Sequence, residues 1–304
     1  MILIITHKRD FTVDFVINNL NKEGIPYKRL NCEDILEYPW SISIKDTFNT
    51  SMLGEKSFRS VWFRRTMLPD LNHLPLEDRN YVLKETEYFL DNLFSILDVK
   101  WVSIPYKVYH AENKLLQLKT AAALGFLLPD TLVTNQKNEL TSFYKKHQGN
   151  IIVKPLGVTR SQNGNNSFLL FTNMVPEEMI SNIKEYDLTP CIFQEYIDKD
   201  IEIRATVIGK QVFAAKVDSQ AHEETKVDWR RERLPFQVFS LPQAISDLCI
   251  KLVDTLGLRF GAIDLIRKKD GAYVFLEINP NGQWVWIEQQ TGLPLTKSLI
   301  KELA

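Results

Sequence analysis

The stretch that decides the fold is YVFLEINPNG, residues 273–282. A short run of apolar, β-prone residues followed by Asn, Pro and Gly is typical of a buried strand that ends in a turn. Because residues i and i+2 of a strand share a face, Glu277 and Asn279 would lie side by side, with Ile278 directed into the core. The sequence therefore predicts a strand that presents a carboxylate and an amide at its end.

A further acidic residue, Asp264, follows a short apolar run at residues 260–263. If the two strands are neighbours, the side-chain oxygens of Asp264, Glu277 and Asn279 converge. Hard oxygen ligands of this kind suit Mg²⁺, which binds carboxylates together with substrate phosphates. Taken alone, the stretch also fits an exposed glutamate followed by an ordinary turn. The sequence upstream has to decide between these two interpretations.

Length and composition indicate an ordinary globular protein. The chain has 304 residues, enough for two or three packed units, and is 44% hydrophobic and 25% charged. Its formal net charge of −1 predicts no general attraction to nucleic acid or to a membrane surface. Cys32, Cys191 and Cys249 are odd in number and widely spaced, and no segment is long and apolar enough to span a bilayer. These features predict a reduced, cytoplasmic protein without a signal peptide.

The expected elements divide the chain into three units and predict an α/β (α+β) fold. Residues 1–105 form a small α/β unit with strands at 2–6, 27–30 and 60–63 and helices at 11–22 and 77–97. Residues 106–192 form an α+β unit with helices at 111–124 and 177–185 and strands at 131–134, 150–154 and 167–172. Residues 193–304 form an α+β unit with strands at 201–208, 212–217, 260–263 and 273–276 and a helix at 245–256.

A lysine and a glycine loop in the second unit are arranged as in a phosphate clamp. Lys154 ends an apolar strand just before Pro155, and a loop rich in glycine and small polar residues follows at 156–166. Gly157 and its neighbours would let backbone N–H groups approach an anion closely. Lys114 stands at the start of a helix. Either lysine alone could be a solvated surface residue, and only their order along the chain favours phosphate binding.

The link between the second and third units has the character of a base-binding site. In QEYI, residues 194–197, backbone groups can hydrogen-bond an adenine edge while Tyr196 and Ile197 line its faces. Glu202 and Arg204 share a face of the next strand. A carboxylate can accept hydrogen bonds from ribose hydroxyls, and a guanidinium can hold a phosphate or an acyl phosphate. The alternative is a surface ion pair across two strands.

Taken in order, these elements resemble the ATP-grasp superfamily over roughly residues 105–290. The resemblance implies ATP held between the second and third units, with Arg204 and Lys154 acting on the transferred phosphoryl group. The implied ATP contacts are Lys114, Lys154, Gly157, Glu195, Tyr196, Ile197 and Glu202, and the implied Mg²⁺ ligands are Asp264, Glu277 and Asn279. Many members carry a basic residue just ahead of the first metal aspartate. This chain has Ala262 and Ile263 there, so Arg267 or another arginine would have to take that role.

Two further motifs combine tryptophan with arginine. They are WFRR at residues 62–65 and DWRR at residues 228–231. Arginines hold carboxylates bidentately and tryptophans anchor apolar peptide faces, so the motifs predict a substrate surface. The alternative is that the tryptophans pack in the core and the arginines are solvated. The predicted substrate-binding residues are Arg64, Arg65, Trp229 and Arg230.

Together with EINPNGQW, residues 277–284, these motifs resemble the microviridin-type ATP-grasp peptide maturases, the macrocyclases of graspetides. This resemblance spans nearly the whole chain. It implies that Asp or Glu side chains of a ribosomal precursor peptide are phosphorylated by ATP. A Thr or Ser hydroxyl, or a Lys amine, of the same peptide then closes an ω-ester or ω-amide ring. It also implies separate recognition of a leader segment, and a homodimer, which is usual in that family.

Other interpretations remain open from the sequence. An amino-acid ligase of the glutathione synthetase or D-alanine–D-alanine ligase kind would share the same ATP site. A non-catalytic ATP-binding module would have no need for the complete set of metal ligands. A general base is not evident, although Asp228 or His222 could serve. Neither the precursor sequence nor the choice of ester or amide can be read from this chain, because the nucleophile belongs to the substrate.

Overall fold

The structure is a computed structural model that describes residues 1–157, 160–163 and 166–304, with the backbone alone for 160–163 and 166–169. Positions 158, 159, 164 and 165 of the predicted glycine loop therefore lie outside the described residues. Across the described ranges, no helix combines the length and the apolar character that crossing a bilayer requires.

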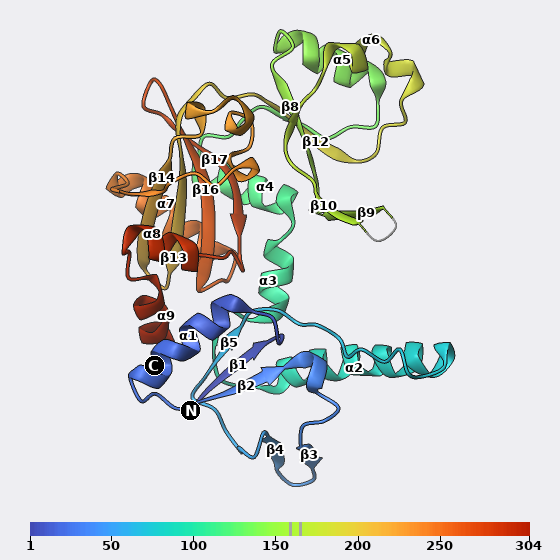
Figure 1. The fold of residues 1–304 in the computed structure, drawn as a ribbon, viewed down its shortest axis with the longest axis vertical. Coiled ribbons are helices and arrows are strands. Elements are labelled where there is room, and N and C mark those ends of the chain that lie inside the picture. Colours follow the sequence, from blue (N-terminus) through green and yellow to red (C-terminus); the bar gives the residue numbers. More distant parts are fainter. Residues whose placement is uncertain (158–159, 164–165) are drawn as a thin grey trace.

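The N-terminal unit is built on a parallel sheet with the strand order β2-β1-β5-β6 (Figure 1). Strand β1 lies inside the sheet and every one of its residues is buried, which explains its continuous apolar sequence. Asp10 caps α1 by accepting hydrogen bonds from the backbone N–H groups of Thr12 and Val13. The elements are β1 (Ile2–Thr6), α1 (Phe11–Lys22), β2 (Tyr27–Asn31), η1 (Cys32–Asp34), β5 (Ser60–Phe63), α2 (Leu76–Ile96) and β6 (Lys100–Val102).

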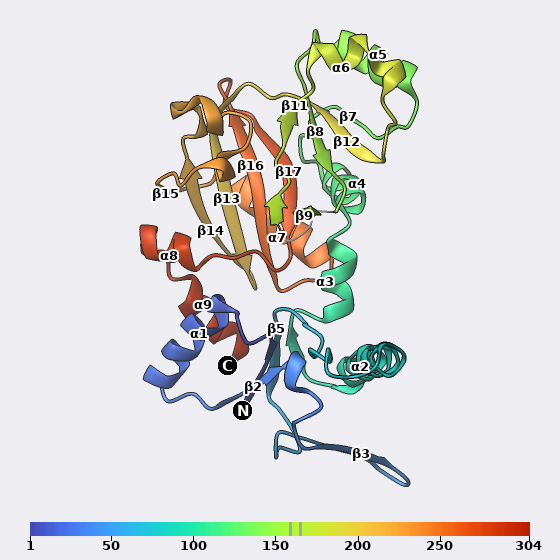
Figure 2. The same ribbon diagram turned by 45° about the vertical axis from the view of Figure 1, so that its right-hand side comes forward.

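A hairpin that the sequence did not reveal leaves this unit. Its strands are β3 (Trp40–Ile44) and β4 (Phe48–Met52), which pair only with each other. Figure 2 shows the hairpin projecting away from the rest of the molecule. Because most of its side chains are exposed on both faces, its sequence lacks the alternation that identifies a half-buried strand.

The central unit has a small antiparallel sheet with the order β11-β8-β12-β7. Its own core consists of Leu140, Phe143, Ile151, Val175 and Phe193. The strand predicted at 167–172 belongs instead to a separate hairpin, in which β10 pairs with β9. The elements are β7 (Thr131–Leu132), α5 (Lys137–Lys146), β8 (Ile151–Pro155), β9 (Arg160–Asn163), β10 (Asn166–Leu169), β11 (Asn173–Met174), α6 (Glu177–Ser181), η2 (Ile183–Glu185) and β12 (Cys191–Glu195).

The C-terminal unit contains a five-stranded antiparallel sheet with the order β15-β14-β13-β16-β17. Helix α7 covers one face of this sheet through contacts with β13, β14 and β16. The elements are β13 (Lys199–Ile208), β14 (Gln211–Val217), η3 (Ser219–Ala221), η4 (Glu223–Thr225), η5 (Trp229–Arg231), β15 (Gln237–Phe239), α7 (Gln243–Thr255), β16 (Phe260–Lys268), β17 (Tyr273–Asn279), α8 (Val285–Thr291) and α9 (Leu295–Leu303).

The helix predicted at 111–124 is two helices, α3 (Pro105–Ala111) and α4 (Lys114–Leu124), and α4 ends at Gly125 with a φ of 92°. Although its place in the chain assigned it to the central unit, α4 packs on α7 and β17 of the C-terminal unit. Gln117 binds both backbone groups of Ile278, donating to its carbonyl at 2.8 Å and accepting from its N–H at 3.1 Å. This docking fixes the start of α4 beside the end of β17.

Candidate active site

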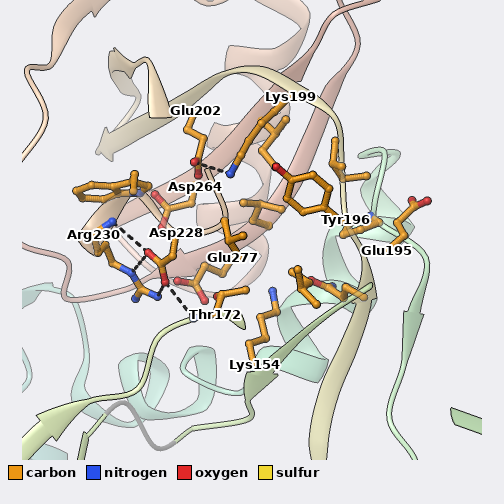
Figure 3. Close-up of a pocket in the computed structure, with 18 of the residues that line it drawn as sticks. Lys154, Thr172, Glu195, Tyr196, Lys199, Glu202, Asp228, Arg230, Asp264 and Glu277 are labelled. Carbon is orange, nitrogen blue, oxygen red and sulfur yellow. Dashed lines mark hydrogen bonds and ion pairs between the residues drawn. The ribbon is translucent and has the colours of Figure 1, made fainter. Parts of the chain in front are cut away.

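A cleft lies between the central and C-terminal units, lined by β8 and β12 on one side and by the C-terminal sheet on the other (Figure 3). A segment of the C-terminal unit, residues 227–230, lies along its edge. Most of the predicted ATP and metal residues line it, namely Lys114, Lys154, Glu195, Tyr196, Ile197, Glu202, Asp264 and Glu277. Gly157 and Asn279 line an adjoining pocket, which also contains Lys114 and Glu277.

The acidic residues lie on neighbouring strands, as the sequence predicts. Asp264 of β16 is directly opposite Glu277 of β17, and Asn279 Nδ2 lies 3.4 Å from Asp264 Oδ2. The register shifts between Asp264 and Leu265, which leaves Leu276 as an extra residue in β17. This bulge allows both Leu276 and Glu277 to face the cleft, while Ile278 is buried in the core.

Arg204 pairs with Asp264, the first of the predicted metal ligands. It lies opposite Asp264 across β13 and β16, and its Nη1 donates to Asp264 Oδ1 and Oδ2 at 2.9 and 2.8 Å. Arg267 pairs with a different carboxylate, since its Nε donates to Asp200 at 2.9 Å. Among the described residues, the buried Nε of Arg204 has no hydrogen-bond partner.

Two lysines balance the charge of Glu277. Lys114 Nζ lies 3.2 Å from Glu277 Oε2. Lys154 is almost fully buried, and burial lowers its pKa to about 8 in spite of the opposing effect of Glu277. Burial acts to raise the pKa of Glu277, but the charges of Lys114, Lys154 and Arg230 outweigh it and lower that pKa. For Asp264, burial outweighs Arg204, and the nearby charge of Glu277 raises the pKa further.

The residues at the predicted base site contribute unequally. The carboxylate of Glu195 points away from the cleft (Figure 3), where Oε1 accepts from the backbone N–H of Asp130 at 2.9 Å. Its backbone N–H also donates to the Asp130 carbonyl, at 3.0 Å, so both of these groups of Glu195 are bound within the protein. Tyr196 donates from its hydroxyl to the carbonyl of Lys226 at 3.3 Å, which joins the link to the C-terminal unit.

Sequence reasoning missed two buried residues of the cleft. Lys199 Nζ donates to Glu202 Oε1 at 2.7 Å, so the predicted ribose ligand is already held by a cation. A register shift between Lys199 and Ile201 brings residues three apart onto one face, which strict alternation would not predict. Gln194 is fully buried and, among the described residues, its Oε1 has no partner.

Most of the motif at residues 62–65 is buried, although Arg64 and Arg65 both line the adjoining pocket. Trp62 is 2% exposed and Arg64 is 1% exposed. The Arg64 guanidinium donates to the carbonyl of Asn281 at 3.1 Å, and its Nε lies 3.5 Å from Asp10 Oδ2. Arg64 is therefore a buried link between the N-terminal unit and the loop after β17. Arg65 is exposed and lines the adjoining pocket.

The second motif lies at the cleft. Trp229 is half-buried against Phe236 and Trp286, and Arg230 pairs with Asp228 at the cleft edge. Both oxygens of Asp228 accept hydrogen bonds, and its pKa is lowered because bonds from Arg230 outweigh the effect of burial. Asp228 is thus a poor general base. His222 is exposed and outside the residues that line the cleft.

Known proteins resemble this chain in sequence. A family model described as RimK-like ATP-grasp domain matches residues 111–303. A probable alpha-L-glutamate ligase of Picosynechococcus sp. is 26% identical over 199 residues, which is 64% of this chain and 64% of that protein. A ribosomal protein bS6--L-glutamate ligase of Salmonella newport is 25% identical over 196 residues, also 64% of each chain. The matched region spans less than two thirds of these relatives.

Solved structures resemble the whole chain. A RiPP-associated ATP-grasp ligase of Chryseobacterium gregarium, in complex with ADP and a leader and core peptide, has a TM-score of 0.89 and 28% identity, covering 99% of this chain and 96% of that one. Macrocyclase MdnC of Microcystis aeruginosa, bound with precursor peptide MdnA, has a TM-score of 0.86 and 28% identity, covering 100% and 99%. The arrangement of three units is therefore the ATP-grasp fold, and the chain belongs to the family of RimK-like ATP-grasp domains.

Proposed function

We propose that this protein is an ATP-dependent ligase that activates Asp or Glu side chains of a ribosomal precursor peptide and closes ester or amide rings within it. The observation that carries the proposal is the likeness over the whole chain, N-terminal unit included, to two ligases solved with precursor peptides. The glutamate ligases match 199 and 196 residues of the chain, 64% of it, whereas the two solved ligases cover 99% and 100% of it. A peptide substrate accounts for the likeness over the whole chain.

ATP would occupy the cleft, with its base against residues 194–197 and its phosphates between Lys114 and Lys154. Lys199 and Glu202 would meet the ribose. The buried position of Lys154 supports a phosphate role, because an ammonium held away from water needs an anion to compensate it. The carboxylates of Asp264, which pairs with Arg204, and of Glu277 line the same cleft.

The donor set at this end fits Mg²⁺. Two carboxylates, of Asp264 and Glu277, lie beside the amide of Asn279, and the described residues contain no cluster of three or more His, Cys, Asp or Glu side chains that could enclose a metal. Mg²⁺ is commonly held by one or two carboxylates and completed by substrate phosphates and water. Bound there, it would neutralise charge on the transferring phosphoryl group.

The reaction that fits this arrangement has two steps. An oxygen of the peptide carboxylate attacks the γ-phosphorus of ATP, which gives an acyl phosphate and ADP. A hydroxyl or amine of the same peptide then attacks the acyl carbon, loses a proton and releases phosphate. Arg204 and the two lysines would stabilise negative charge in both steps, and no nucleophile of the protein is required.

The peptide would enter through the pocket that adjoins the cleft. Arg65, Tyr109 and Glu112 line it together with the turn at residues 279–282, and it shares Lys114 and Glu277 with the cleft. Arg65 is exposed there and can pair with a substrate carboxylate. Trp229 and Arg230 of the C-terminal unit line the neighbouring cleft.

The three predicted units, with boundaries near residues 105 and 192, belong to the same proposal, although α4 shows that packing does not follow those boundaries. All three cysteines are free thiols, which supports a location in the reducing cytoplasm. A homodimer is proposed by resemblance alone, and the molecular mass in solution tests it.

The proposal is tested by mass spectrometry of a short peptide rich in Thr or Ser and Asp or Glu, encoded beside this gene and produced together with the protein. The expected result is the loss of one water per ring, absent with Glu277→Gln. Asp254→Asn is the matched control, because it makes the same change in a surface pair with Lys210, away from the cleft. No mass change, together with ADP release on free glutamate, would favour an amino-acid ligase instead.

A further inference from the structure

Asp228 is buried and its carboxylate binds two units of the protein at once. Its Oδ1 accepts from Arg230 Nε at 2.8 Å and from the Arg230 backbone N–H at 3.1 Å. Its Oδ2 accepts from Arg230 Nη2 at 2.5 Å and from the backbone N–H of Thr172 at 3.1 Å. Asp228 is 5% exposed, so its carboxylate is largely shielded from water, whereas the Arg230 side chain reaches solvent. Figure 3 shows Asp228 between Arg230 and Thr172.

The two partners of Asp228 come from different sides of the cleft. Thr172 directly precedes β11 of the central unit, whereas Asp228 and Arg230 lie at η5, between β14 and β15 of the C-terminal unit. A second contact strengthens this junction, because Arg231 Nη2 donates to the Thr172 carbonyl at 3.0 Å and to Asn173 Oδ1 at 2.6 Å. Asp228 therefore links the central unit to the C-terminal unit through hydrogen bonds to both.

The guanidinium of Arg230 is directed at the charged end of the cleft. Arg230 lines the cleft with Lys154, Asp264 and Glu277. The pKa of Arg230 is raised, chiefly by its hydrogen bond to Asp228 and further by the charges of Glu277 and Asp264. A bidentate contact holds a planar guanidinium in one orientation, which an unpaired arginine would not keep.

We propose that Asp228 is a positioning residue that directs Arg230 at the terminal phosphate of ATP and does so only while the Thr172 N–H of the central unit occupies its second oxygen. When the two units separate, Oδ2 loses one of its two donors, and the carboxylate that holds the guanidinium is no longer held in place by the central unit. The orientation of Arg230 is thereby coupled to the position of the central unit. The inference rests on the proposed function only in placing ATP in this cleft.

The experiment measures affinity for ADP and for a non-hydrolysable ATP analogue, each with Mg²⁺, by titration calorimetry of the full chain. Asp228→Asn removes the charge that holds the guanidinium and keeps the shape of the side chain. We expect it to lower the affinity for the triphosphate about tenfold, a typical effect of one charge-assisted hydrogen bond, and to change ADP affinity less than twofold. Arg230→Ala should produce the same loss.

Coupling between the two residues distinguishes positioning from a general structural role. If Asp228 acts through Arg230, adding Asp228→Asn to Arg230→Ala causes no further loss. Arg230→Lys leaves Asp228 intact, but a lysine cannot form the bidentate contact. Its loss of triphosphate affinity should equal that of Asp228→Asn, and it replaces Asp228→Asn as the test if the latter folds poorly. Arg231→Ala tests the coupling between the units, because it removes a contact across the same junction without touching the Arg230 guanidinium, and we expect it to cause a smaller loss of triphosphate affinity.

Several results would overturn this inference. They are an unchanged triphosphate preference in Asp228→Asn or in Arg230→Ala, equal losses for ADP and the triphosphate, or additive losses in the double variant. Since every readout is nucleotide binding, failure of the peptide proposal leaves the result interpretable.

Discussion

The guanidinium of Arg64 donates a 3.1 Å hydrogen bond to the carbonyl of Asn281, two residues after the proposed metal ligand Asn279. Its Nε lies 3.5 Å from Asp10, and its guanidinium lies over the ring of Trp284 at 5.3 Å. A buried charge from the N-terminal unit thus supports the turn that follows the candidate metal ligands.

Arg64→Met should destabilise the protein strongly. The change leaves Asp10 buried without its counter-charge, and breaking such a pair typically costs about 3–5 kcal/mol of unfolding free energy. Adding Asp10→Asn should recover part of the loss, because asparagine still caps α1 but carries no charge. Urea unfolding gives these values. Arg65→Met is the control and should stay within about 0.5 kcal/mol, as expected for an exposed residue.

Lys154→Met should stabilise the protein without nucleotide while abolishing its activity. A lysine whose pKa falls from 10.5 to about 8 in the folded state opposes folding wherever the unfolded chain keeps the proton. The gain should be about 3 kcal/mol below pH 8 and should shrink as the pH rises towards 10.5, because the wild type regains stability there.

The other buried lysine of the cleft provides a control of opposite sign. Lys199 pairs with Glu202 at 2.7 Å, and Lys199→Met would leave that carboxylate buried and unpaired. Unfolding measured at pH 7 and at pH 9.5 should show a stabilised Lys154 variant and a destabilised Lys199 variant. Destabilisation of both variants would contradict the proposal that Lys154 is buried at a cost in stability in order to bind phosphate.

Gln194 should select adenine over guanine. The Thr131 hydroxyl donates its only proton to the Pro129 carbonyl at 2.7 Å, so it must accept from Gln194 Nε2 at 2.9 Å. The Gln194 amide is therefore oriented with Nε2 towards Thr131, which leaves Oε1 to accept another hydrogen bond. An acceptor suits the amino group of adenine and opposes the carbonyl of guanine. Gln194→Met should lower ATP affinity about tenfold, leave GTP affinity nearly unchanged and have little effect on stability.

Thr131→Val removes the hydroxyl that orients the Gln194 amide, so the amide nitrogen and oxygen can exchange places. We expect it to lower the preference for ATP over GTP less than Gln194→Met does. Fluorescence titration with both nucleotides measures the ratio. An unchanged ratio in Gln194→Met would mean that the base lies elsewhere.

Gly282→Ala should displace the turn that carries Asn279. A Cβ at position 282 would lie 2.6 Å from the Cβ of Ala262, a contact that real side chains do not make, and 3.3 Å from the carbonyl of Asn279. We expect weaker Mg²⁺-dependent nucleotide binding in this variant. Adding Ala262→Gly removes the Cβ that the new methyl group would meet, and it should restore most of the Mg²⁺-dependent nucleotide binding. A second substitution away from position 282 should not restore it.

The sequence predicted what depends on short-range pattern. An apolar run followed by Glu277 and Asn279 was enough to place both at a strand end, and a second run placed Asp264 beside them. It did not reveal the bulge at Leu276 or the pairing of Lys199 with Glu202, because both depend on register shifts between strands. Alternation alone cannot predict such shifts.

The burial of Arg64 was equally beyond the sequence. Two adjacent arginines differ completely in exposure, because strand β5 ends between Phe63 and Arg64 and only Arg64 meets Asp10 and the turn after β17. That contact joins residues more than two hundred positions apart. The hairpin of β3 and β4 was missed for the opposite reason, since it buries too little surface to leave a pattern.

The central claim, that the carboxylate of a peptide is activated as an acyl phosphate, is tested most directly by oxygen transfer. A precursor peptide labelled with ¹⁸O in its Asp and Glu side chains is incubated with the protein, ATP and Mg²⁺, and the released phosphate is analysed by mass spectrometry. The account predicts one ¹⁸O in phosphate for each ring formed and for each ADP released. Rings formed without label in phosphate, or ADP released without rings, would contradict it.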